Sequence, residues 1–220
     1  MAPLLLMALR VGILSDTHVG DELPRLPSEA IRHLAGVDLI LHAGDLIEPG
    51  VLSELEQIAP VVAVRGNHDP ARIAVPDHTV LELEGLRIGL THGTRPALVE
   101  HLSAAAWVVT GRLDIAGHCR ALVRRFPPVD CVVFGHLHIP IRQMVGPTLC
   151  FSPGSVYQPE GDPSFDWSSR SRRIYRAVRR RLPESYRRSA VGVLELAEGR
   201  VRAHAVELIR PLRAVEAPPD

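Results

Sequence analysis

Side chains of the types that bind metal ions recur in this chain at the ends of short apolar segments. They follow five such segments: Asp16 and His18; Asp45; Asn67 with His68 and Asp69; His92; and His136 with His138. Asp16 and His18 are two residues apart, so in extended backbone they point to the same side and can hold one cation together. His136 and His138 have the same spacing. Residues of these types in this order indicate hydrolysis of a phosphoester by two metal ions.

Phosphoester hydrolysis near neutral pH needs a nucleophile stronger than water and positive charge beside the phosphoryl oxygens. Two cations about 3.5–4 Å apart supply both through a bridging hydroxide. A carboxylate shared by the two cations offsets their mutual repulsion, and Asp45, which ends its apolar segment before a turn, is the natural candidate. The neutral imidazoles and the Asn67 amide leave the site cationic enough to attract phosphate.

The elements that must position these side chains are short buried strands. The segments 11–14, 39–41, 61–64, 88–90 and 132–134 are rich in Val, Ile and Leu and lead into turn residues, which is typical of buried strands. We expect further strands over 79–83, 141–145, 148–151, 191–196 and 201–208, with the strand at 88–90 extending over 87–91 as one half of a hairpin. We expect helices over 27–34, 51–58, 96–108 and 115–126. The pattern predicts an α/β fold, a four-layer αββα sandwich of two mixed β-sheets flanked by helices. The site would lie beyond the carboxyl ends of the strands.

Composition limits the number of domains and the partners. A length of 220 residues fits one domain, which we expect over 1–213 with an insertion at about 160–189 and a disordered tail at 214–220. The 25 basic and 25 acidic residues balance, so no overall charge favours nucleic acid, and no membrane partner is expected. The apolar stretch 1–9 lacks the basic start of a signal peptide and is too short to span a membrane, so we expect a cytoplasmic protein.

The predicted insertion is rich in arginine. Residues 164–189 contain nine arginines against Asp166 and Glu184. Ile174, Val178 and Leu182 recur every fourth residue, which predicts a basic amphipathic helix over about 172–182. Three interpretations stay open: a solvated helix covering part of the sandwich, a site for a phosphate-rich ligand such as a nucleotide or nucleic acid, and a contact within a homo-oligomer. Nucleic acid is the minority interpretation because no aromatic residues alternate with the arginines.

Together the five segments resemble the motifs of the calcineurin-like metallophosphoesterase superfamily, in its small bacterial and archaeal phosphodiesterase branch. The eukaryotic retromer scaffold subunit Vps29 is related to that branch. The resemblance covers residues 16–138, and the turn 152–155 is similar to the Asn-Pro-Gly-Ser turn of the branch. It implies one metal ion on Asp16, His18, Asp45 and His138, and a second on Asp45, Asn67, His92 and His136. Manganese is expected, and iron, zinc or nickel suit the same ligands.

The resemblance also implies that His68 stabilises or protonates the leaving oxygen, and Asp69 could orient its ring. Pro49 stands where larger protein phosphatases carry an arginine that contacts the terminal phosphate, so a phosphodiester is favoured over a dianionic monoester. Arg65 or an arginine of the insertion could still supply that contact. We therefore expect a phosphodiesterase with a small phosphorylated substrate. The alternatives are a phosphomonoesterase or nuclease of the same fold, and a non-catalytic scaffold, which lacks the Asn-His pair found here.

Overall fold

The computed structural model describes residues 8–162 and 165–208. Its strands are β1 (Leu9–Leu14), β2 (Leu39–His42), β3 (Val61–Ala63), β4 (His78–Leu83), β5 (Leu86–Thr91), β6 (Cys131–Val133), β7 (Pro140–Val145), β8 (Thr148–Pro153), β9 (Ala190–Ala197) and β10 (Arg200–Glu207). Its α-helices are α1 (Ser28–Leu34), α2 (Gly50–Glu56), α3 (Ala97–Thr110), α4 (Ile115–Val123) and α5 (Arg170–Arg179), with 3₁₀ turns at Pro159–Gly161 and Glu184–Arg187. The predicted tail 214–220 lies outside the described residues.

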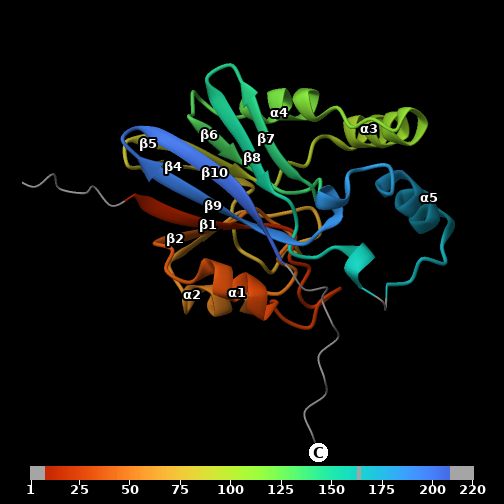
Figure 1. Ribbon diagram of the computed structural model, residues 1–220, viewed down its shortest axis with the longest axis horizontal. Helices are drawn as coiled ribbons and strands as arrows, with labels where there is room; N and C mark the ends of the chain where they lie inside the picture. The colour runs from red at the N-terminus through yellow and green to blue at the C-terminus, as the bar shows by residue number, and fades with distance from the viewer. Residues whose placement is uncertain (1–7, 163–164, 209–220) are drawn as a thin grey trace, which may run out of the picture.

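Within the described residues the strands form two mixed sheets of five strands each. One has the order β10-β9-β1-β2-β3, and the other has the order β4-β5-β6-β8-β7. In the first sheet β1, β2 and β3 run parallel, β9 pairs antiparallel with β1, and β10 pairs antiparallel with β9 at the edge. Helices α1 and α2 cover the first sheet and α4 covers the second (Figure 1). The predicted αββα sandwich is confirmed.

Successive side chains of a strand point to opposite faces of its sheet, and this alternation divides the core into three apolar clusters. Val11 and Ile13 of β1 point toward the second sheet and pack with Val133 of β6. Leu14, on the opposite side of β1, packs with α1 and α2, and Val132 of β6 packs with α4. Both faces of β1 and β6 are therefore buried, which explains their unbroken apolar sequences and holds their ends rigidly for the site beyond them.

The Arg-rich insertion contains the predicted helix, which begins two residues earlier and ends three residues earlier than expected. Ser169 caps α5 by accepting a hydrogen bond from the Arg172 backbone N–H at 3.2 Å. Arg179 is fully buried, with Nε 2.6 Å from Glu160 Oε1. Its Nη2 donates to Gln158 Oε1 at 2.6 Å. One arginine of this stretch therefore anchors the helix. Among the described residues, none of the helices has both the length and the apolar composition needed to cross a membrane.

Candidate metal centre

Each predicted ligand lies just past the carboxyl end of a strand. Asp16 and His18 follow β1, Asp45 follows β2, Asn67 follows β3, His92 follows β5, and His136 and His138 follow β6. The structure brings these seven side chains together at one edge of the sandwich. Residues more than 100 positions apart in the chain meet there because parallel strands place their carboxyl ends at a common edge.

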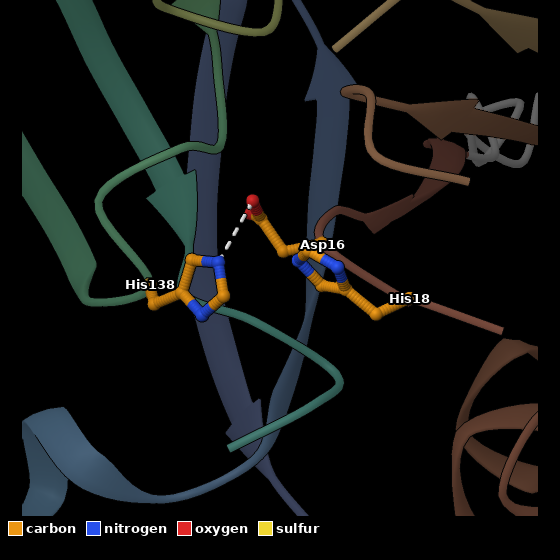
Figure 2. Close-up of side chains that lie close together, drawn as sticks. All are labelled: Asp16, His18 and His138. Carbon is orange, nitrogen blue, oxygen red and sulfur yellow. Dashed lines mark ion pairs between the residues drawn. The ribbon is translucent and has the colours of Figure 1, made fainter. Parts of the chain in front are cut away.

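The first group of side chains consists of Asp16, His18 and His138 (Figure 2). Their potential ligand atoms all lie within 4.8 Å of one another. Asp16 Oδ1 is 3.2 Å from His138 Nε2, and the Asp16 side chain is fully buried. The backbone N–H of His136 donates to Asp16 Oδ2 at 3.1 Å, which fixes the carboxylate between the loops that follow β1 and β6.

The second group consists of Asp45, Asn67, His92 and His136. Asn67 Oδ1 lies 3.0 Å from His92 Nε2 and 3.1 Å from His136 Nδ1. Asp45 Oδ2 is 3.4 Å from His92 Nε2. The same oxygen is 3.7 Å from His18 Nε2 of the first group. The Asp45 carboxylate therefore contacts both groups.

The backbone is strained where the ligands lie. Asp16, His18, Asp45, His136 and His138 have φ values of 53°, 49°, 57°, 69° and 55°. Residues other than glycine rarely adopt such values, and each costs about 1–3 kcal/mol unless its surroundings enforce it. Hydrogen bonds between loops enforce it here: the backbone N–H groups of Thr17 and His18 both donate to the Asp45 carbonyl at 3.1 Å. Strain concentrated at these residues is typical of a functional site.

The protonation states leave the carboxylates charged. Burial raises the pKa of Asp16, but attraction by His138 and their hydrogen bond outweigh it and hold the pKa below its usual range. Burial also raises the pKa of Asp45, and its hydrogen bond with His92 outweighs that effect. Burial lowers the pKa of His18 to about 4, so its ring is neutral at pH 7. For His92 the hydrogen bond with Asp45 outweighs burial and raises the pKa to about 9.

This arrangement fits divalent cations. His18 Nε2 and His138 Nδ1 are buried, and neither has a hydrogen-bond partner among the described residues. Buried polar atoms are rarely left without a partner, and here they accompany ionised carboxylates and the Asn67 amide oxygen. Carboxylate, imidazole and amide donors of this kind suit manganese, iron, zinc or nickel. The two groups of side chains can therefore hold metal.

The chain is similar to known phosphoesterases. Residues 9–167 match the calcineurin-like phosphoesterase superfamily domain. A probable metallophosphoesterase from Methanothermobacter thermautotrophicus is 35% identical over 156 residues, which span 70% of this chain and 81% of that protein. The chain belongs to the calcineurin-like phosphoesterase superfamily. Members of this superfamily bind divalent metal ions. The Asp and His groups of this metallophosphoesterase agree with that property, because they could hold such ions.

Two further comparisons place this calcineurin-like phosphoesterase among its relatives. A Methanocaldococcus jannaschii protein named as a phosphodiesterase is 25% identical over 161 residues, which span 66% of this chain and 83% of that protein. The structure of vacuolar protein sorting 29 from Cryptosporidium parvum superposes with a TM-score of 0.60 at 19% identity, covering 91% of this chain and 98% of that one. The second likeness shows that the two proteins share a fold.

His68 and Asp69 lie beside the two groups but make different contacts. The exposed His68 ring has its centroid 5.4 Å from that of His18, and the His68 backbone N–H donates to Asp45 Oδ1 at 2.9 Å. The sequence predicts that Asp69 orients the His68 ring, but its carboxylate instead accepts backbone N–H groups. These belong to Asp45 at 3.0 Å, Ile47 at 2.8 Å and Gly66 at 2.8 Å. The physical reason is that backbone amides in loops beyond strand ends lack partners in the sheet, and the Asp69 carboxylate accepts their hydrogen bonds. Asp69 thereby joins the two ligand loops that follow β2 and β3 in this metallophosphoesterase.

Sequence reasoning missed a carboxylate that contacts a predicted ligand. Glu100 of α3 has Oε1 3.4 Å from His136 Nε2. Arg95 holds the same carboxylate, with Nε 3.1 Å from Oε1 and Nη2 3.3 Å from Oε2. No sequence signal marks Glu100, because it lies inside a helix and away from the motifs. Thr94, whose hydroxyl donates to Asn67 Oδ1 at 3.1 Å, follows the His92 motif closely enough to have been considered.

Proposed function

We propose that this calcineurin-like phosphoesterase hydrolyses phosphodiesters with the help of two divalent cations. The first would be held by Asp16, His18, Asp45 and His138, and the second by Asp45, Asn67, His92 and His136. The observation that carries the proposal is the Asp45 carboxylate, whose Oδ2 lies 3.7 Å from His18 and 3.4 Å from His92. Bound cations would supply an activated water and neutralise the nonbridging oxygens of the phosphate. Manganese is our first choice of metal.

The chain's own residues would position the substrate and the proton. His68 stands exposed beside His18, 5.4 Å from it between ring centroids, where it can stabilise or protonate the leaving oxygen. Asp69 keeps the loops after β2 and β3 joined through three backbone hydrogen bonds. His68 is therefore the catalytic candidate, and Asp69 is a positioning residue.

Two arginines near the site are already bound to other protein groups, which supports a diester as the substrate. Arg65, which could replace the missing phosphatase arginine, donates from Nη2 to the Ile73 carbonyl at 2.8 Å. Arg72 donates from Nη2 to Glu48 Oε1 at 2.7 Å. Because these groups are engaged elsewhere, a dianionic monoester gains less from them than it would from an arginine aimed at the phosphate. The M. jannaschii relative named as a phosphodiesterase supports the same choice.

The test compares three substrates with purified, manganese-loaded protein: bis-p-nitrophenyl phosphate, p-nitrophenyl phosphate and single-stranded DNA. We expect the diester to be hydrolysed with the highest kcat/KM. Asp45→Asn should reduce it by about 10³-fold or more, since several kcal/mol of transition-state stabilisation depend on the metal ions. His68→Ala should reduce it by about 10²-fold, whereas His204→Ala, at an exposed position on β10, should leave it unchanged.

Three results would overturn the proposal. Wild-type activity in Asp45→Asn would show that this carboxylate holds no essential metal ion. A metal-loaded protein that is inert toward all three substrates would favour a non-catalytic scaffold, and a preference for the monoester or for DNA would reassign the substrate class.

A further inference from the structure

Helix α3 exposes a row of apolar residues on the side that faces away from the protein. It is 14 residues long and has no buried residue. Leu98, Leu102 and Val109 are 70%, 62% and 82% exposed. Together with the exposed Ala105 they are spaced by four, three and four residues, which places them in one stripe along the helix. An apolar stripe of this kind normally packs against another element.

The opposite side of α3 holds the helix against the rest of the chain. Glu100 contacts Arg95 and His136 there. Trp107 packs edge-on against Tyr175 of α5, with ring centroids 6.4 Å apart, and Figure 1 shows α3 and α5 side by side at one end of the molecule. At 100° per residue, Trp107 lies about 180° around the helix from Leu98.

This geometry separates the apolar stripe from the arginines. Helix α5, which carries exposed Arg170, Arg172 and Arg173, lies behind α3 as seen from the stripe. The stripe itself contains no charged residue. A partner on the stripe would therefore meet an uncharged apolar ridge, which suits another apolar helix better than an anionic surface.

The stripe is complementary to itself. In an antiparallel pair of α3 helices about a two-fold axis between positions 103 and 104, residues whose numbers add to 207 face each other. Leu98 then meets Val109 of a second copy, and Leu102 meets Ala105. Val99 and Val108, which are 41% and 40% exposed, lie on opposite edges of the stripe and flank this contact. Each leucine is thus opposite a smaller side chain, as close helix packing requires.

We propose that a second copy of this chain covers the stripe and forms a two-fold symmetric dimer through antiparallel α3 helices. Such an interface uses the same patch on both copies. The two α5 helices would remain on the outer sides, so their arginines would not repel each other at close range. The inference is independent of the phosphodiesterase proposal, although the dimer would also steady the helix that carries Glu100.

The expected dimer is weak. A helix of 14 residues is about 21 Å long, and a contact of that length is near the lower limit of stable interfaces. We expect a dissociation constant on the order of 10 µM, which sedimentation velocity from 1 to 200 µM would measure. Leu102→Asp should raise the constant at least 100-fold. Met144→Asp, at a half-exposed position on β7, is the matched control and should leave it unchanged.

Disulfide formation tests the register. The native cysteines are buried. Leu98→Cys protein mixed with Val109→Cys protein should form a disulfide-linked dimer under mild oxidation. Either variant alone should not, because positions 98 of the two copies would be about 16 Å apart along the helices and a disulfide needs Cα atoms within about 7 Å.

Circular dichroism that matches wild type would show that each variant is folded. The proposal is overturned if the wild-type protein is a monomer at 200 µM or if Leu102→Asp dimerises like wild type. It is also overturned if two copies of the Leu98→Cys variant form a disulfide with each other. A monomer whose stripe binds phosphatidylglycerol vesicles would assign the surface to a membrane instead.

Discussion

Replacing Glu100 tests whether α3 helps to hold a metal ligand. The Glu100 carboxylate is 3.4 Å from His136 Nε2, while His136 Nδ1 faces Asn67 Oδ1 at 3.1 Å. An imidazole that donates one N–H to a carboxylate keeps its other nitrogen free for a metal ion and fixed in direction. We therefore expect Glu100→Ala to weaken binding of the second cation specifically.

The size of the effect follows from the contacts. Removing an outer partner of a metal-bound histidine commonly costs 10–100-fold in metal affinity. The Glu100 side chain is 24% exposed, so water partly screens the interaction, and we expect about 10–30-fold for Glu100→Ala. Glu100→Gln keeps an oxygen that can accept the His136 N–H but loses the charge. A neutral acceptor is weaker than a charged one, so about 3–10-fold is expected.

Calorimetric titration of metal-free protein with Mn²⁺ measures the affinities and the number of ions directly, without an activity assay. Wild type should bind two ions, and only one of the two affinities should fall in the Glu100 variants. Glu56→Ala, at an exposed glutamate that ends α2, is the control. Two wild-type affinities in Glu100→Ala would refute the reasoning. An equal loss of both, with reduced helicity, would point to unfolding of α3.

Three other predictions follow from contacts in and near the site. Gly66→Ala should lose metal binding by calorimetry and at least about 100-fold in diesterase activity, because a Cβ there would lie 2.1 Å from Asp45 Oδ1 and force the ligand aside; a fully active variant would contradict this. Arg179→Met should destabilise the protein by about 3–5 kcal/mol in urea unfolding, since it leaves buried partners without their cation. Arg180→Met, at the exposed neighbouring position, should lower the free energy of unfolding by less than about 0.5 kcal/mol, and equal effects of the two substitutions would disprove the role of burial. Because its pKa is raised to about 9, His92 is protonated in metal-free protein at pH 7, and a cation must displace that proton. Metal affinity should therefore rise up to about tenfold per pH unit up to pH 9; titration in buffers of different ionisation enthalpy that detects no released proton would rule this out.

The amino-acid sequence determined the strands, their succession along the chain and the places where chemical groups follow them. These features are local: the apolar runs before Asp16, Asp45 and His136 are short, consist mostly of Val, Ile and Leu and are followed by turn residues, and burial on both faces of a strand requires such runs. Since the carboxyl ends of neighbouring parallel strands share an edge, convergence of these residues could be predicted without coordinates. Within the described residues the structure has this arrangement.

Only the tertiary structure decided which other residues contact the predicted ligands. Asp69 follows His68 directly, yet its carboxylate binds backbone amides of two loops. Arg179 is one of nine arginines in its segment, and its burial depends on Glu160 and Gln158 lying beside it. Glu100 meets His136 because α3 packs beside the loop after β6. These contacts join residues brought together by packing, and the direction in which a helix presents each face is set by its neighbours in space rather than by its own periodicity.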